Sequence, residues 1–277
     1  MDLNSLPSLR ETVDSYDLMA KKALGQNFLL DRNITDKIIS LSLEKQNLHD
    51  FKRSYIFEVG PGPGGLTRSI LAKDPEKLTV VELDNRCIAI ANEIKAVVGK
   101  KLEVLNQDAL KFDFHNIGQP PRHIISNLPY NISVPLLIKW LKHIEDFSSL
   151  TLMFQKEVAD RIAAPINTKD YGRISILSQL LCRIDRLIDL NPKNFTPAPK
   201  VWSTVLLFRP LETKIPKQAI EKLEQFTNLA FNQRRKMIRS SLKSVPNLEE
   251  KCAQIGIATS LRAEQIPPEQ FLALALS

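Results

Sequence analysis

The feature that most constrains this chain is an apolar run that leads straight into a cluster of glycines. Tyr55–Val59 reads as a buried strand, and GPGPGG follows at 60–65, so four of the nine glycines in 277 residues lie together. Glycine lets the backbone turn tightly and approach a ligand closely. A helix is predicted from Leu66. A strand, a glycine turn and a helix form the start of a nucleotide-binding α/β unit.

The glycine spacing also fits a dinucleotide-binding fingerprint. Gly60, Gly62 and Gly65 have the required spacing, and Glu82 follows 22 residues after Gly60. Glu82 ends a second apolar run, Leu78–Val81, where a carboxylate can accept hydrogen bonds from both hydroxyls of a ribose. The alternative is a surface acid at the end of a strand. A nicotinamide-dependent oxidoreductase is therefore one function class, although this motif alone is a weak signal.

A third unit places another acid after a strand. A helix is predicted over 85–98 and a strand over 102–105, and Asp108 comes shortly after them. Its carboxylate could accept a hydrogen bond from an adenine amine. It could equally be an Asx-type turn residue. Taken alone, this stretch leaves both interpretations open.

The next apolar run, His123–Ile125, leads into a polar and aromatic motif, Asn127-Leu128-Pro129-Tyr130. Open α/β sheets bind ligands at the carboxyl ends of such strands. Asn127 offers a side-chain oxygen, Pro129 a carbonyl without an N–H, and Tyr130 a flat face for stacking. These groups suit a planar base with an exocyclic amine. The alternative is a strand that ends in a proline turn.

Composition and charge bound the class of protein. The net charge of +7 and the pI near 9.2 permit a polyanionic partner. Cys87, Cys182 and Cys252 are scattered without metal-ligand spacing, so we expect a reducing, cytoplasmic setting and no metal. The apolar runs are too short for a bilayer, and residues 1–10 lack the apolar core of a secretory signal, so we expect no membrane association.

The remaining pattern alternates between helices and strands. Asp31 is the predicted N-cap of a helix through Leu43, with Ile34, Ile38 and Leu41 on one face. Further helices are predicted over 134–143, 156–163 and 171–182, and strands over 150–154, 184–190 and 201–209.

The last part of the chain has a helical pattern throughout. Residues 210–216 read as a linker, and the apolar residues after it recur at helical spacing: Ile220, Leu223, Phe226, Leu229 and Ala230. We therefore predict one domain over 1–210 and a second over 211–277.

Segments between residues 21 and 243 jointly carry a likeness to a known family. They are LGQNFLLD (24–31), FEVGPGPGGLT (57–67), VVELD (80–84), NQDA (106–109), SNLPYNIS (126–133), FQKEVADRI (154–162), YGRISILSQ (171–179), FTPAPKVWSTV (195–205) and NQRRKMIRSSL (232–242). Together they resemble the small-subunit ribosomal RNA adenine dimethyltransferase family. The resemblance implies a Rossmann-like methyltransferase with a mostly parallel seven-stranded sheet and a small all-α C-terminal domain. It implies S-adenosylmethionine as cofactor and N6,N6-dimethylation of two adjacent adenosines in a hairpin loop near the 3′ end of 16S rRNA in the 30S subunit.

The resemblance assigns roles to individual residues. The implied cofactor contacts are Asn27, Leu29, Gly60, Glu82, Asp108 and Asn127. Asn127, Pro129 and Tyr130 would be the catalytic residues that hold the target base, with Tyr130 stacking on one face. Phe195 is the candidate for the other face, and its alternative is a core aromatic beside a turn. Trp202 departs from many relatives, which have a small or polar residue there, without consequence for the chemistry.

Basic residues near both ends are candidates for contact with RNA phosphates, with a solvated surface as the alternative. They are Lys21, Lys22, Arg234, Arg235, Lys236, Arg239 and Lys243. A nicotinamide oxidoreductase would leave the Asn-Leu-Pro-Tyr motif without a role. A non-catalytic RNA-binding relative would not need the cofactor contacts. Within the enzymes, the second candidate is the 23S rRNA adenine methylase of macrolide resistance, and we expect a monomer in either case.

Overall fold

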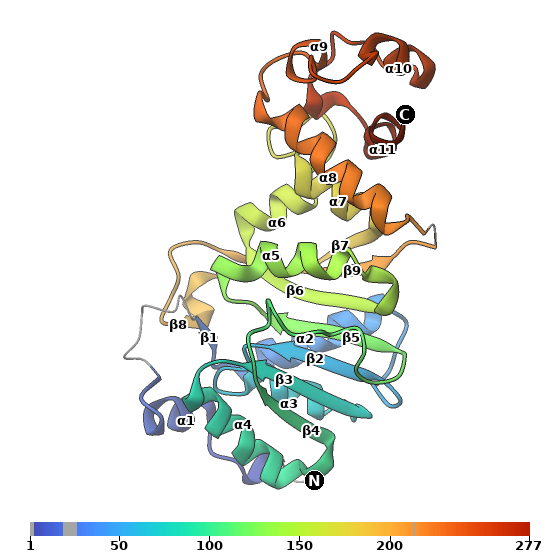
Figure 1. Ribbon diagram of the computed structural model, residues 1–277. Helices are drawn as coiled ribbons and strands as arrows, with labels where there is room; N and C mark the ends of the chain where they lie inside the picture. Colours follow the sequence, from blue (N-terminus) through green and yellow to red (C-terminus); the bar gives the residue numbers. More distant parts are fainter. Residues whose placement is uncertain (1–2, 19–26, 213) are drawn as a thin grey trace. The chain divides into compact units, whose positions relative to one another are not determined.

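The computed structural model describes residues 3–18, 27–212 and 214–277. Its strands are β1 (Phe28–Leu29), β2 (Tyr55–Val59), β3 (Lys77–Glu82), β4 (Leu102–Asn106), β5 (Arg122–Asn127), β6 (Ser149–Gln155), β7 (Cys182–Leu190), β8 (Phe195–Thr196) and β9 (Ser203–Pro210). A seven-stranded sheet has the order β4-β3-β2-β5-β6-β9-β7, and β1 pairs with β8 separately (Figure 1).

The order of the strands creates the position for a ligand site. β2 is parallel to β3 and β5, β3 to β4, and β5 to β6, whereas β9 is antiparallel to β6. The chain runs outward from β2 to β4 and then returns to the other side of β2 with β5. The carboxyl ends of β2 and β5 therefore meet at a topological switch point, where open α/β sheets bind ligands. This arrangement confirms the predicted α/β fold with a mostly parallel sheet.

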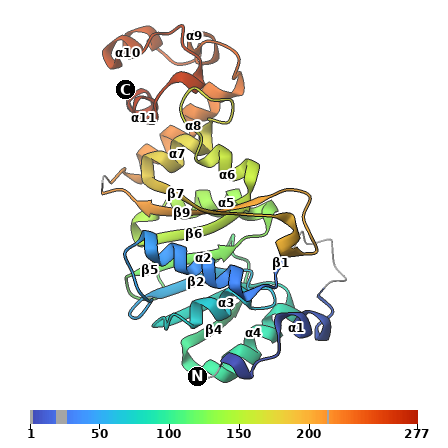
Figure 2. The ribbon, with the colours of Figure 1, turned by 180° about the vertical axis from the view of Figure 1, so that it is seen from behind.

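Helices cover both faces of the sheet. The helices of the described residues are α1 (Leu9–Ser15), α2 (Arg32–Lys45), α3 (Gly65–Leu71), α4 (Asn85–Val98), α5 (Tyr130–Leu141), α6 (Lys156–Ile162), α7 (Arg173–Leu181), α8 (Lys217–Asn232), α9 (Ile238–Ser241), α10 (Leu248–Ile255) and α11 (Pro268–Leu276). α2 and α3 lie side by side on one face, seen in front in Figure 2, and α5 lies on the other. Because both faces are covered, all five residues of β2 are buried, which explains its continuous apolar run.

Two helices differ in detail from the sequence prediction. Asp31 caps α2 as predicted, by accepting from the Asn33 N–H, but the buried face is centred on Ile39, and Leu41 is only half-buried. The predicted apolar face of α2 is therefore rotated around the helix axis from the face that is buried. α5 begins at Tyr130, earlier than the predicted residue 134, since the Ile132 N–H already bonds to the Pro129 carbonyl at 3.1 Å. Tyr130 therefore sits at the first turn of a helix.

Two features of the structure, helix α1 near the N-terminus and the small sheet, were not predicted from the sequence. α1 begins at a capping box in which Ser8 and Glu11 bond to each other's backbone N–H groups. Leu9 and Val13 of α1 are buried. β1 and β8 pair through Phe28–Thr196 and Leu29–Phe195. Two-residue strands carry no periodicity that a sequence pattern could show.

The tertiary contacts divide the described chain into two compact units. The first comprises residues 1–139, 145–156 and 185–209, and the second comprises 140–144, 157–184 and 210–277, each apart from its undescribed residues. The second unit is helical beyond residue 210, as predicted. It also takes in 157–184, and the predicted domains 1–210 and 211–277 stay a prediction.

The second unit has a core of its own. Ile220, Leu223, Phe226 and Ala230 of α8 are buried as their spacing predicted, but Leu229 is 43% exposed. The sequence predicted a helical pattern throughout this region, but the basic stretch after α8 is only partly helical. α8 ends at Asn232, and α9 holds only Ile238–Ser241. Within the described residues, no helix has both the length and the apolarity that crossing a bilayer requires.

Candidate active site

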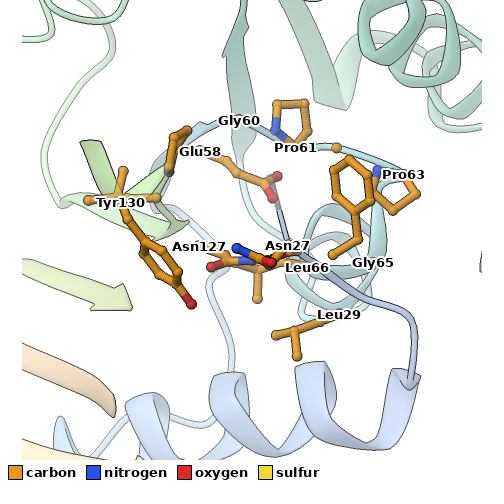
Figure 3. Close-up of a pocket in the computed structure, with 14 residues that line it drawn as sticks. Asn27, Leu29, Glu58, Gly60, Pro61, Pro63, Gly65, Leu66, Asn127 and Tyr130 are labelled. Carbon is orange, nitrogen blue, oxygen red and sulfur yellow. Dashed lines mark hydrogen bonds between the residues drawn. The ribbon is translucent and has the colours of Figure 1, made fainter. Parts of the chain in front are cut away.

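A cleft opens at the switch point, between the carboxyl ends of β2 and β5. Figure 3 shows the residues that line it, and the Glu58 carboxyl lies among them. The Ser126 hydroxyl donates to the Val59 carbonyl at 2.6 Å and so ties the ends of the two strands together. The lining residues come from the segment around β1, from β2 and the glycine-rich loop after it, from the start of α3, and from the end of β5 and the residues after it: Asn27, Phe28, Leu29, Glu58, Gly60, Pro61, Gly62, Pro63, Gly65, Leu66, Asn127, Leu128, Pro129 and Tyr130.

The glycine-rich loop needs glycine for two separate reasons. Gly60 has a φ of +69°, in the left-handed region that other residues rarely adopt. A Cβ at Gly62 would lie 2.8 Å from the Phe28 ring, which packs against the loop. The loop therefore closes tightly over β1 and leaves its backbone facing the cleft.

Asn127 is held in one orientation by a contact with the other side of the cleft. Its side-chain nitrogen donates to the backbone carbonyl of Asn27 at 3.1 Å. An amide has donors only on nitrogen and an acceptor on oxygen, so this bond assigns the oxygen as the group left for a ligand. Figure 3 shows the two asparagines next to each other in the pocket. Asn127 thus combines a contact to the segment around Asn27 with an acceptor at the end of β5.

Tyr130 is fixed at its hydroxyl. Its hydroxyl oxygen lies 2.8 Å from the hydroxyl oxygen of Ser203, which is fully buried at the start of β9. Burial raises the pKa of the Tyr130 phenol above its ordinary value, and the bond to Ser203 partly opposes this. The phenol is therefore neutral at physiological pH. With its hydroxyl anchored, the ring is a rigid apolar wall of the cleft.

A second hollow of about 320 Å³ adjoins the cleft, and Gly60 and Pro129 line both. Glu82, the last residue of β3, and Asp108, which follows β4, both line it. Its lining is Val59, Gly60, Val81, Glu82, Leu83, Asp84, Gln107, Asp108, Ala109, Leu110, Pro129, Asn131 and Ile132.

Glu82 has one carboxylate oxygen in use and one available. The backbone N–H groups of Leu83 and Asp84 donate to Oε1 at 2.7 and 2.9 Å. Oε2 is buried and has no hydrogen-bond partner among the described residues. Burial raises the pKa of Glu82, and the two backbone bonds partly counter the shift. A buried acceptor without a partner is costly, so this oxygen suits a ligand hydroxyl.

Asp108 satisfies one of the two interpretations that the sequence left open, and is compatible with the other. Its Oδ1 accepts the Leu110 N–H at 2.9 Å, which is the bond of an Asx-type turn. A carboxylate has two oxygens, so this turn does not prevent an adenine contact through the other. Its place in the hollow with Glu82 brings the two acids to one ligand-sized space.

Glu58 lines the cleft and was not among the predicted site residues. It is 1% exposed, and burial raises its pKa to about 8. The Thr67 hydroxyl donates to its Oε2 at 2.6 Å. The available signal was an acid inside an otherwise apolar strand, two residues before Gly60. Charged side chains are almost never fully buried without a partner, so an acid in an apolar strand next to the glycine-rich loop is a signal for a site residue.

Several other predicted site residues lie outside the cleft. Phe195 is 3% exposed and belongs to the core around β2, as its core alternative expected, so in this position its ring is not open to a base. Arg234 bonds to Glu264 at 3.1 Å and to the carbonyls of Thr168 and Tyr171, which are structural contacts within the second unit. Four others are exposed: Arg235, Lys236, Arg239 and Lys243. Lys21 and Lys22 lie outside the described residues.

The sequence also matches known proteins over nearly its whole length. The family described as ribosomal RNA adenine dimethylase matches residues 18–277. The chain belongs to this family. It is thus a methyltransferase.

Individual relatives agree with this assignment. The chain is 46% identical over 272 residues to a ribosomal RNA small subunit methyltransferase A from Rhodospirillum rubrum, covering 98% of this chain and 92% of the relative. It is 46% identical to that of Cereibacter sphaeroides over 278 residues, covering 99% and 97%.

Solved structures show the same fold for this dimethylase. A dimethyladenosine transferase from Plasmodium falciparum has a TM-score of 0.72 at 26% identity, covering 88% of this chain and 94% of that one. The 23S rRNA methyltransferase ErmE has a TM-score of 0.65 at 25% identity, covering 90% and 98%.

Proposed function

We propose that the protein transfers methyl groups from S-adenosylmethionine to the N6 atoms of two adjacent adenosines in a hairpin loop near the 3′ end of 16S rRNA, within the 30S subunit. The observation that carries this proposal is the fixed Asn127 amide, whose oxygen is left as an acceptor beside the Tyr130 ring and the Pro129 carbonyl. The acceptors can bind the exocyclic amine of an adenine, and the flat face can stack on its ring.

The hollow that adjoins the cleft fits the nucleoside part of the cofactor. The unpartnered Oε2 of Glu82 can accept ribose hydroxyls, and Asp108 can accept the adenine amine. Gly60 lines both spaces, and Asn27 and Leu29 line the cleft. The methionine part would lie there, and the buried Glu58 can receive its ammonium group. When bound, the cofactor supplies a methyl group on a positively charged sulfur, which is already a strong electrophile.

The residues of the cleft have to make the adenine N6 atom a better nucleophile. The N6 lone pair of adenine is conjugated into the ring and attacks poorly. An acceptor that holds an N6 hydrogen can keep the lone pair out of the ring plane and in line with the methyl group. Asn127 Oδ1 is oriented for this task. The Pro129 carbonyl already accepts the Ile132 N–H, but a carbonyl oxygen has a second lone pair for a substrate.

The target must leave its helix or come from a loop, because a paired amine cannot reach the cleft. Tyr130 offers the face on which such an unpaired base would stack. The role of Phe195 on the opposite face would require its ring to leave the core, so it stays a prediction. The exposed basic residues of the second unit, Arg235, Lys236, Arg239 and Lys243, are proposed to contact phosphates.

The small subunit is the preferred substrate over the large one. The relatives described as small subunit enzymes are 44–46% identical to this chain, whereas the 23S enzyme ErmE is 25% identical. The protein is proposed to act as a monomer. Action on ribosomal subunits would place the protein in the cytoplasm.

The test is a direct comparison of the two subunits. The protein is incubated with methyl-labelled S-adenosylmethionine and either unmethylated 30S or 50S particles. Label in the 30S RNA, recovered as dimethyladenosine, is the expected result. Label in the 50S RNA alone would move the proposal to the 23S class, and binding of NADH without S-adenosylmethionine would end it.

A further inference from the structure

An exposed tryptophan stands next to the residue that anchors Tyr130. Trp202 is 46% exposed and Val201 is 43% exposed, whereas Ser203 immediately after them is fully buried. The second tryptophan, Trp140, is fully buried. Among the described residues, Trp202 is the one aromatic side chain that is largely exposed. An indole that is largely exposed to water is a candidate for contact with a partner.

The backbone of Trp202 is held in place on both sides. Its carbonyl oxygen accepts the Lys156 N–H at 2.8 Å. The next residue, Ser203, pairs with Gln155 at the edge of β6 and β9, and its hydroxyl meets the Tyr130 hydroxyl at 2.8 Å. Consecutive Cα atoms are ~3.8 Å apart, so the indole begins one residue from the contact that fixes the stacking ring. The backbone of Trp202 is therefore fixed one residue away from the contact that holds Tyr130, which lines the cleft.

The neighbours of Trp202 favour a nucleic acid as its partner. Lys200 is exposed two residues before it. Aromatic rings beside cations are the combination with which proteins hold single-stranded nucleic acid, because the rings stack on bases and the cations follow the phosphates. One indole and one valine make too small an apolar area for a protein interface of ordinary size.

We propose that Trp202 is a stacking platform for the nucleobase next to the target adenine in the RNA strand. The inference rests on the proposed function, in which two adjacent adenosines are modified. When one adenosine enters the cleft, its neighbour loses a stacking partner. A fixed indole can replace that partner without reading the sequence. Trp202 is thus an RNA-positioning residue, and it touches neither the cofactor nor the reacting amine.

The test compares binding, kinetics and fluorescence in four proteins. They are the wild type, Trp202→Ala, Trp202→Phe and Val201→Ala, each with native circular dichroism. Trp202→Ala should raise the KM for unmethylated 30S particles and the Kd for a hairpin RNA with two adjacent loop adenosines by roughly 5- to 150-fold, the range expected for one base–aromatic stack. Trp202→Phe should restore most of the affinity, and the equally exposed Val201→Ala should match the wild type. Affinity for S-adenosylmethionine should be the same in all four.

Fluorescence reports the stack itself. The chain has two tryptophans, so in Trp202→Phe only the buried Trp140 emits. Saturating hairpin RNA should quench the wild type and leave Trp202→Phe unchanged. Equal RNA affinity and KM in the wild type and Trp202→Ala, in an enzyme that dimethylates 30S particles, would overturn this inference and leave the proposed function intact. If Trp202→Ala lost affinity only for 30S particles, and the hairpin did not quench the wild type, Trp202 would contact a ribosomal protein. That result would overturn the inference as well. A wild type that neither binds nor methylates the RNA would overturn both proposals.

Discussion

The side-chain nitrogen of Asn127 donates a hydrogen bond to the backbone carbonyl of Asn27, 3.1 Å away. The bond joins the end of β5 to the residue that precedes β1, two places 100 residues apart in the sequence. It leaves the Asn127 oxygen as the acceptor that the proposed reaction needs. Because the partner on the Asn27 side is backbone, the orientation of Asn127 does not depend on the Asn27 side chain.

This relationship separates the roles of the two asparagines. Asn127→Ala should lower kcat with RNA and cofactor saturating, because it removes an acceptor that acts in the transition state; loss of one such group typically costs about 10²- to 10³-fold. Asn27→Ala keeps the carbonyl, so its effect should fall mainly on the Kd for S-adenosylmethionine. Single-turnover kinetics and calorimetry distinguish the two. An Asn27→Ala protein with the kcat defect of Asn127→Ala would contradict this division.

The second prediction concerns the unpartnered oxygen of Glu82. Glu82→Ala should weaken S-adenosylmethionine binding by about 1–3 kcal/mol, the range for a hydrogen bond to a charged group. Glu76→Ala, which removes an exposed acid from the opposite end of β3, is the control and should bind as the wild type does. Calorimetry measures both. Unchanged affinity in Glu82→Ala would remove this carboxylate from the cofactor site.

The third prediction follows from the buried carboxyl of Glu58, whose pKa is raised to about 8 by burial. In the unfolded chain the group ionises near its ordinary pKa of 4.5. Between about pH 4.5 and pH 8 the folded state holds a proton that the unfolded state has lost, so Glu58 makes stability fall as pH rises across this window. Glu58→Gln cannot ionise and should lose this contribution.

Urea unfolding of the cofactor-free protein at several pH values tests it. The stability of Glu58→Gln relative to the wild type should increase from about pH 5 to about pH 8. A pH-independent difference between the two proteins would mean that Glu58 is ionised throughout, and that burial does not set its pKa. Thr67→Val, which removes the donor to Glu58, should raise the pKa further.

The fourth prediction divides the basic stretch of the second unit. Arg234→Ala should destabilise the protein, since it breaks the bonds to Glu264 and to two backbone carbonyls. Arg235→Ala and Lys236→Ala together should leave stability unchanged and reduce the salt dependence of 30S binding by roughly one unit of slope per phosphate contact. Thermal melts and binding at several salt concentrations separate the effects. A wild-type salt slope in the double variant would return these residues to an ordinary solvated surface.

The central strands β2, β5 and β6 were predictable because burial on both faces gives apolar runs between glycine, proline and polar breaks, whereas β4 and β7 at the edges of the sheet are only partly buried. β2 and α4 were placed residue for residue, and the predicted site acids Glu82 and Asp108 followed from strand ends. The sequence pattern does not show contacts between residues that are far apart in the chain. Phe195 and Tyr130 are both aromatic residues near prolines, and only the fold shows that one is in the core and the other lines the cleft. The sequence likewise does not distinguish Arg234 from Arg235, and only the structure shows that Arg234 bonds to Glu264.

The last prediction concerns how Tyr130 holds the target base. Its hydroxyl bonds to Ser203, so the ring face is the part that a base can contact. Tyr130→Phe and Ser203→Ala each remove that bond and keep the face, and dimethylation should largely persist in both, with stability lower by about 0.5–1.5 kcal/mol. Tyr130→Ala loses stacking worth about 1–3 kcal/mol per base, so activity should fall while cofactor binding survives.

The product itself gives a sharper readout of the same idea. After one transfer only one N6 hydrogen remains, so the monomethylated base must turn its methyl group away from the cofactor while that hydrogen still meets an acceptor. Without the ring to stack on, the monomethylated base should dissociate from the cleft before its methyl group has rotated away. Tyr130→Ala should therefore accumulate monomethyladenosine. Mass spectrometry of nucleosides from treated 30S particles measures the ratio of the two products. An inactive Tyr130→Phe, or a Tyr130→Ala with wild-type activity and product ratio, would show that the ring face does not hold the base.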